Sequence, residues 1–121
     1  MHNHIPLKFA QKSETTALEK ATIALSVFPE TERVVLFGSR VRGDFEGSSD
    51  IDILIIVTDI SIKNKVISAL HDIELEYDVP LSPVIFTHRE YDMNKKLKSG
   101  FIENVEREGI VLYDAKRKRK N

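Results

Sequence analysis

Two aspartates separated by one residue, Asp50 and Asp52, are the side chains in this 121-residue chain best suited to chemistry. Apolar residues occupy alternate positions after them, as in a β-strand with one buried face, so both carboxylates are expected on the other face. Residues two apart on a strand lie roughly 6.5 Å apart, close enough to share one ion. Like charges at this spacing raise a pKa unless a cation neutralises them. The pair therefore predicts a metal site with Asp50 and Asp52 as ligands.

The ligand types available around this pair indicate a hard cation. The chain has no cysteine, and the segment around the two aspartates contains no histidine. Ligand sets made of oxygen atoms favour Mg²⁺ or a similar ion over zinc. We therefore expect Mg²⁺ as the cofactor.

A glycine–serine turn precedes the aspartates by about ten residues. A short apolar run ends at Gly38, which is typical of a buried strand that enters a tight turn. Gly38 lets the backbone approach a ligand closely, and Ser39 supplies a hydroxyl and an amide donor for phosphate oxygens. Arg40 and Arg42 add charge-assisted hydrogen bonds to the same phosphates. With Ser49 as a further expected contact, these residues predict a nucleotide site beside the metal.

The pair Gly38 and Ser39, followed after about ten residues by Asp50 and Asp52, resembles the motif of the DNA polymerase beta-like nucleotidyltransferase superfamily. The small size resembles its minimal nucleotidyltransferase (MNT) branch. The resemblance implies that Gly38 and Ser39 bind the phosphates of ATP or another NTP, and that Asp50 and Asp52 are catalytic and bind Mg²⁺. It implies transfer of a nucleoside monophosphate, AMP above all, to a hydroxyl. Members of this branch commonly act as antitoxins beside a small helical HEPN-domain protein, which implies such a partner here.

One position departs from the pattern of that family. The family usually places a third carboxylate on the next core strand, where it binds metal and helps to deprotonate the attacking hydroxyl, and the aligned residue here is Ser82. Serine is a weak base and a poor ligand. Asp78, just before this strand, substitutes for the acid only if the backbone bends toward the site. The departure leaves open a second hypothesis, a catalytically degenerate binding module that neutralises or regulates a partner by contact alone. A third, an aminoglycoside-modifying transferase, requires an extra helical domain for which the chain has no room.

Length and composition predict a single small domain. A chain of 121 residues with 41% hydrophobic residues has room for one core. The absence of cysteine excludes disulfides and fits a reducing compartment. We find no signal peptide and no apolar run long enough to cross a membrane, so we expect a cytoplasmic protein without membrane contact. Residues 1–115 are expected to form the domain, and residues 116–121 a disordered basic tail.

Charge is distributed unevenly along the chain. Residues 116–120 are all basic, and the rest of the chain carries 13 basic against 19 acidic residues. An acidic body is not expected to bind nucleic acid, because neutralisation of phosphate charge dominates that affinity. Weak contact between the tail and RNA or an acidic partner stays open.

Periodicity and capping signals predict the elements that must position these residues. A capping box at Thr16 and Glu19 predicts a helix that ends before Pro29. Pro83 lacks an amide donor and is expected at a sheet edge or a bulge. The remaining patterns predict strands at 34–37, 51–57, 81–86 and 110–113, and helices at 61–77, 87–97 and 101–108. The predicted fold class is α/β (α+β), a small mixed nucleotidyltransferase-like sheet flanked by helices.

Overall fold

The sheet is the centre of the fold in this computed structural model, which describes residues 10–44 and 50–119. Within that part of the chain, four strands form one sheet in the order β3-β2-β1-β4. β2 runs antiparallel to β1 and parallel to β3, and β4 runs antiparallel to β1. The strands are β1 (Thr31–Phe37), β2 (Ile51–Val57), β3 (Leu81–Thr87) and β4 (Ile110–Asp114). The predicted small mixed sheet flanked by helices is confirmed.

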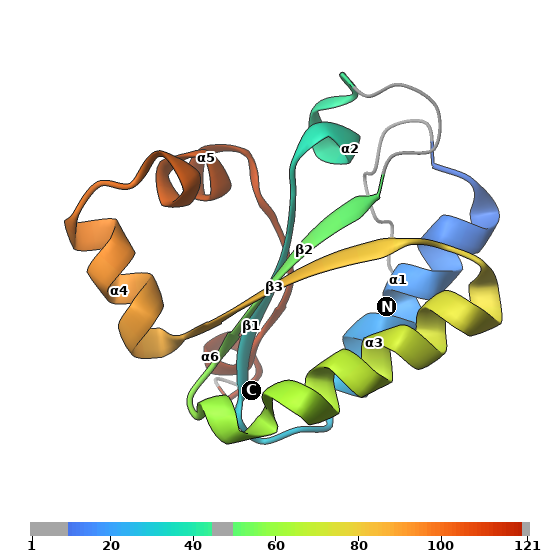
Figure 1. Ribbon diagram of the computed structural model, residues 1–121, viewed down its shortest axis with the longest axis horizontal. Coiled ribbons are helices and arrows are strands. Elements are labelled where there is room, and N and C mark those ends of the chain that lie inside the picture. The colour runs from blue at the N-terminus through green and yellow to red at the C-terminus, as the bar shows by residue number, and fades with distance from the viewer. Residues whose placement is uncertain (1–9, 45–49, 120–121) are drawn as a thin grey trace.

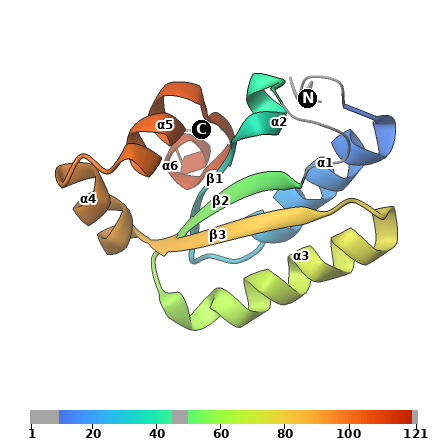
Figure 2. The ribbon, with the colours of Figure 1, turned by 45° about the horizontal axis from the view of Figure 1, so that its top comes forward.

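Helices cover both faces of this sheet (Figure 1). α1 (Lys12–Ser26) and α3 (Lys63–Tyr77) lie on one face, and Figure 2 shows α4 (His88–Lys96) and α5 (Gly100–Glu108) on the opposite face. The shorter helices are α2 (Ser39–Arg42), the 3-10 turn η1 (Ile60–Ile62) and α6 (Ala115–Arg119). Across the described ranges, none of the helices has the length and hydropathy that a membrane span requires.

The central strand β2 is buried on both faces, which corrects the expectation of one buried face. Ile51, Ile53 and Ile55 are fully buried in the core beneath α1 and α3. Leu54 and Ile56 on the opposite face are also fully buried, in a second core that includes residues of α4 and α5. Asp52 is therefore the one residue of β2 that is not fully buried, and the alternation of buried and exposed residues does not continue beyond it.

The first helix begins earlier than the sequence predicted. It starts at Lys12 rather than Thr16, and its capping box joins Gln11 and Glu14. The Gln11 backbone N–H donates to Glu14 Oε1 at 2.8 Å, and the same carboxylate pairs with Arg40. The early start follows from this capping box, a local signal that the more usual pair Thr16 and Glu19 outweighed in the sequence, and the ion pair with Arg40 holds Glu14 in place.

The other helix signals near the second core agree with the structure. Thr87 and Glu90 form the predicted capping box of α4, with backbone to side-chain distances of 2.9 and 3.0 Å. Pro83 lies on β3, an edge strand of the sheet, as its missing amide donor predicted.

The basic segment after β4 differs from the predicted disordered tail. Residues 115–119 form the short helix α6, and the Lys116 backbone N–H donates to Asp114 Oδ1 at 3.0 Å. Ala115 is buried, so the first residue of this helix belongs to the domain. The side chain of Asp114 thus starts a helical turn where the run of basic residues alone indicated disorder.

Candidate active site

Asp52 lies in the middle of the sheet with a neighbour on each side. The antiparallel register places it opposite Phe37 on β1, and the parallel register places it opposite Ser82 on β3. By strand alternation its side chain shares a face with Leu54, the face covered by α4 and α5. Asp50 immediately precedes β2 and is exposed. The two predicted acidic residues therefore stand at the start of the central strand, as expected.

Gly38 brings the backbone of the turn against the Asp52 carboxylate. Its φ of 89° and ψ of −166° belong to a region that only glycine occupies readily. A Cβ atom added at Gly38 would collide with Asp52 Oδ2. The Gly38 carbonyl accepts from the backbone N–H groups of Val41 and Arg42 at 3.1 Å, which closes the turn. The glycine is thus required both for the bend and for the close approach to Asp52.

The surroundings of Asp52 disfavour its ionised form. Burial raises the pKa of the Asp52 carboxyl, and the negative charge of Asp50 raises it further. The positive charge of Arg42 and a hydrogen bond from the Ser82 side chain act in the opposite direction. A cation next to these two carboxylates relieves the repulsion between them. Because the donors that converge here are carboxylate and hydroxyl oxygens, the site fits a hard divalent ion such as Mg²⁺.

Ser82 occupies the place where the family resemblance puts a third carboxylate. Its position opposite Asp52 in the parallel register and its hydrogen bond to that side chain bring it to the site. Asp78, the possible substitute, is the exposed C-cap residue of α3 with a φ of 54°. Within residues 10–44 and 50–117, no three acidic or histidine side chains gather as a metal cluster. The acidic donors that the described residues bring to this site are therefore Asp50 and Asp52.

Arg40 is not brought to this site, although its neighbours in the sequence are. Its side chain is 4% exposed, and Arg40 Nη2 pairs with Glu14 Oε1 of α1 at 2.7 Å. This ion pair lowers the pKa of the Glu14 carboxyl. The structure thus gives Arg40 a buried contact that joins α2 to α1, where the sequence suggested a phosphate contact.

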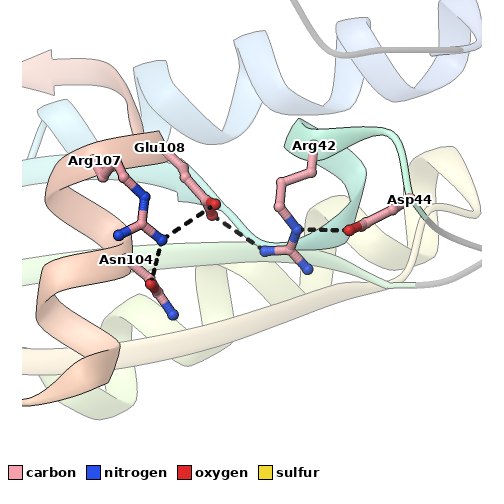
Figure 3. Close-up of polar contacts among 5 residues, drawn as sticks. All are labelled: Arg42, Asp44, Asn104, Arg107 and Glu108. Atoms are coloured by element: carbon pink, nitrogen blue, oxygen red, sulfur yellow. Dashed lines mark hydrogen bonds and ion pairs between the residues drawn. The ribbon is translucent and has the colours of Figure 1, made fainter.

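Arg42, in contrast, lies on the site side of the turn and is held by two carboxylates (Figure 3). Arg42 Nε lies 2.9 Å from Asp44 Oδ2, and Arg42 Nη1 lies 3.2 Å from Glu108 Oε1. These two partners raise the pKa of the Arg42 guanidinium. Sequence reasoning missed Glu108, because it lies 66 residues further along the chain and nothing in its local pattern marks it.

The remaining predicted contact residues differ in how far the structure describes them. Ser39 is the first residue of α2, directly after Gly38, and its carbonyl accepts from the Gly43 backbone N–H at 2.7 Å. Ser49 lies outside the described residues. Gly38, Ser39 and Arg42 are therefore the predicted nucleotide contacts that the structure places around Asp52.

Known proteins share both the sequence and the fold of this chain. The family model described as polymerase beta, nucleotidyltransferase matches residues 19–118. A protein of Methanocaldococcus jannaschii named “Putative protein adenylyltransferase” is 35% identical over 96 residues, which cover 77% of this chain and 90% of that protein.

Two crystal structures resemble the fold. One is of a toxin–antitoxin with AMP-PNP, with a TM-score of 0.53, 18% identity, and coverage of 91% of this chain and 79% of that chain. The other is of a mutant of the toxin–antitoxin MntA–HpeT, with a TM-score of 0.52, 16% identity, and coverage of 88% and 77%. The family match, the related sequence and the site geometry together show that this chain belongs to the polymerase beta nucleotidyltransferase family and is a nucleotidyltransferase.

Proposed function

We propose that this nucleotidyltransferase uses Mg²⁺ to transfer AMP from ATP to a hydroxyl group of a partner protein. The partner that we propose is a small helical HEPN-type protein, with this chain as the antitoxin of the pair. ATP as the donor also implies that the reaction takes place in the cytoplasm. The relative named as a protein adenylyltransferase supports the choice of AMP and of a protein acceptor.

The single observation that carries this proposal is the contact between the Gly38 turn and the Asp52 carboxylate. This contact brings the glycine–serine turn, the part of the chain that we propose to bind phosphate, against Asp52. In our proposal Asp50 and Asp52 hold the metal, while Gly38, Ser39 and Arg42 contact the triphosphate. The metal, when bound, neutralises charge on the phosphates and on the two carboxylates. Ser49 is proposed as a further nucleotide contact on the basis of its sequence position alone.

The proposed reaction forms one bond and breaks one. The acceptor oxygen bonds to the α-phosphorus of ATP, the bond to the β-phosphate bridging oxygen breaks, and pyrophosphate leaves with that oxygen. Because Ser82 stands where a carboxylate would accept the hydroxyl proton, the proton passes to water. Catalysis then depends on positioning and on charge stabilisation more than on a strong base.

A protein acceptor is supported by the fold comparison and by the size of the domain. The two solved structures described above are of toxin–antitoxin proteins, and one contains AMP-PNP. A 121-residue domain has little surface left to enclose a second substrate by itself. A partner that brings its own hydroxyl to the site removes that requirement.

Labelled ATP tests this function directly. The full chain is incubated with Mg²⁺, a small helical HEPN-type protein as the proposed partner, and ATP labelled at either the α- or the γ-phosphate. We expect label on the partner from α-labelled ATP only, since AMP transfer releases the γ-phosphate within pyrophosphate. The double variant Asp50→Ala with Asp52→Ala should lose the label, whereas the control Asp72→Ala, at an exposed position of α3, should keep it.

Two outcomes would contradict the proposal in different ways. Label from γ-labelled ATP would indicate phosphoryl transfer. Absence of label under all conditions, with a stable complex between the two proteins, would favour the binding module that acts by contact alone, the reading that Ser82 supports.

A further inference from the structure

A polar network connects the turn that follows Gly38 with the C-terminal end of α5 (Figure 3). Arg42 closes α2, and Glu108 is the last residue of α5. Their side chains meet at 3.2 Å between Arg42 Nη1 and Glu108 Oε1. On the other side of the guanidinium, Arg42 Nε lies 2.9 Å from Asp44 Oδ2. Two carboxylates on different elements thus fix both the position and the plane of the Arg42 guanidinium.

Glu108 is held in place from its own side. Ile102 and Val105 of α5 are almost fully buried in the second core, so the helix is anchored to the sheet. The Glu108 side chain is 23% exposed, less than that of Arg42 at 41%. Glu108 is therefore the less mobile partner, and Arg42 is positioned by it rather than the reverse.

The charge of Glu108 is shared between two arginines. Glu108 Oε2 lies 3.6 Å from Arg107 Nη2, which also donates to Asn104 Oδ1 at 2.6 Å. With Asp44, the network therefore contains two arginines and two carboxylates, so Arg42 carries no excess of negative charge that would repel a phosphate. A guanidinium carries five N–H groups, so it can hold carboxylates and a phosphate oxygen together.

We propose that Glu108 is a positioning residue that holds the Arg42 guanidinium beside Asp52, ready to bind the triphosphate. This role rests on the proposed function, in which Arg42 contacts the phosphates. A long arginine side chain loses rotamer entropy when it is immobilised. Where Glu108 has already fixed the side chain, the nucleotide does not bear that cost. α5 thereby controls nucleotide affinity without touching the nucleotide.

The test measures ATP affinity and a double-mutant cycle on the full chain. Isothermal titration calorimetry with ATP and Mg²⁺ is applied to wild type, Glu108→Ala, Glu108→Gln, Arg42→Ala and the double variant Arg42→Ala with Glu108→Ala. We expect Glu108→Ala to weaken ATP binding about three- to ten-fold, the range for a partly exposed charge-assisted contact. Glu108→Gln should stay within about two-fold of wild type, because its amide oxygen still accepts from Arg42. In the Arg42→Ala background, Glu108→Ala should cause no further loss.

A matched variant and a ligand-free measurement accompany the cycle. Glu103→Ala removes the same charge from an exposed position of α5 and should leave ATP affinity unchanged. Loss of a negative charge at the C-terminal end of a helix does not oppose the helix dipole, so Glu108→Ala is expected to fold. In its ligand-free form, hydrogen exchange of the backbone amides of residues 41–43 should be faster than in wild type.

The outcomes separate this inference from the function on which it rests. If the wild type takes up no ATP, the nucleotide assignment fails, and the role of Glu108 fails with it. If the wild type binds ATP and Glu108→Ala binds it equally well, or if the losses of the two single variants add, the role of Glu108 alone is overturned. Tighter ATP binding by Glu108→Ala would overturn it too, since Glu108 would then compete with the phosphates for Arg42.

Discussion

Replacement of Gly38 by alanine tests whether the turn is built around Asp52. The Gly38 φ of 89° with ψ of −166° costs an alanine about 1–3 kcal/mol in backbone strain. The new Cβ would also collide with Asp52 Oδ2, and the Cγ and Cβ atoms of the same side chain lie close behind that oxygen. We expect Gly38→Ala to lower the free energy of unfolding by about 2 kcal/mol, which corresponds to a fall in melting temperature of roughly 6–10 °C for a domain of this size.

The same substitution should also weaken the uptake of ATP with Mg²⁺. The added methyl group displaces the Asp52 carboxylate from the turn at Gly38, so we expect at least about a ten-fold loss of affinity, equivalent to about 1.4 kcal/mol. Thermal unfolding followed by circular dichroism measures the first effect, and isothermal titration calorimetry measures the second.

Gly100→Ala is the matched control for this experiment. An added Cβ at Gly100 meets nothing within 4 Å, and the residue opens α5. This variant should be as stable as wild type or up to about 1 kcal/mol more stable, with unchanged ATP affinity. If Gly38→Ala behaved like Gly100→Ala in both assays, the close approach of the turn to Asp52 would have no role in stability or binding, and our account of the site would be refuted.

Three further predictions concern other parts of the molecule. Glu14→Gln removes the carboxylate that pairs with the buried Arg40 guanidinium at 2.7 Å and should lower the free energy of unfolding by about 2 kcal/mol in urea titrations at pH 7. Because the pKa of Glu14 is lowered in the folded state, its carboxylate contributes to stability above pH 4.5, and this contribution is lost as pH falls through the folded-state pKa. The stability of Glu14→Gln should lack this pH dependence. Burial and the hydrogen bond to Glu106 raise the pKa of Tyr91 to about 12, so its phenolate absorbance should appear near pH 12, and Glu106→Gln should lower that midpoint. The corresponding stabilisation is complete below pH 10 and is lost as pH rises through about 12. Ser82→Asp adds an acid opposite Asp52, one of the two proposed metal ligands, and should raise Mn²⁺ affinity at least about five-fold by calorimetry while lowering stability in the absence of metal.

Each of these has a result that would count against its reasoning. Glu14→Gln with wild-type stability would mean that the ion pair between Glu14 and Arg40 contributes nothing to the free energy of unfolding. The titration of Tyr91 is identified as the phenolate absorbance that Tyr91→Phe lacks. A midpoint of this titration near pH 10 would mean that neither burial nor Glu106 raises the pKa of Tyr91. Unchanged Mn²⁺ affinity in Ser82→Asp would mean that position 82 does not reach the metal.

Local patterns in the sequence were sufficient for most elements of the fold. The capping box at Thr87 and Glu90 correctly placed the start of α4, because both partners lie within one helical turn. Pro83 correctly predicted an edge strand, because a missing amide donor excludes a central position whatever the rest of the chain does. In contrast, the start of α1 was predicted four residues too late, since Thr16 and Glu19 form a more usual capping pair than Gln11 and Glu14, and α6 was not predicted, since its run of basic residues resembles a disordered tail.

The burial of β2 shows a second limit of local reasoning. Alternation around Asp52 correctly put the two aspartates at the start of a strand, but Leu54 and Ile56 further along are also buried. The hydrophobic residues on both faces were visible in the sequence, yet only the placement of α4 and α5 over the second face accounts for them.

The sequence by itself determined the acid pair, the glycine turn and the strand that carries them, because backbone periods and dihedral preferences act over a few residues. The tertiary structure alone decided which arginine serves the site. Arg40 and Arg42 are equivalent by composition and spacing, but Arg40 turns to Glu14 on α1 and Arg42 turns to Glu108 on α5. Those partners are 26 and 66 residues away along the chain, and charge pairs over such separations are fixed only when packing brings their elements together.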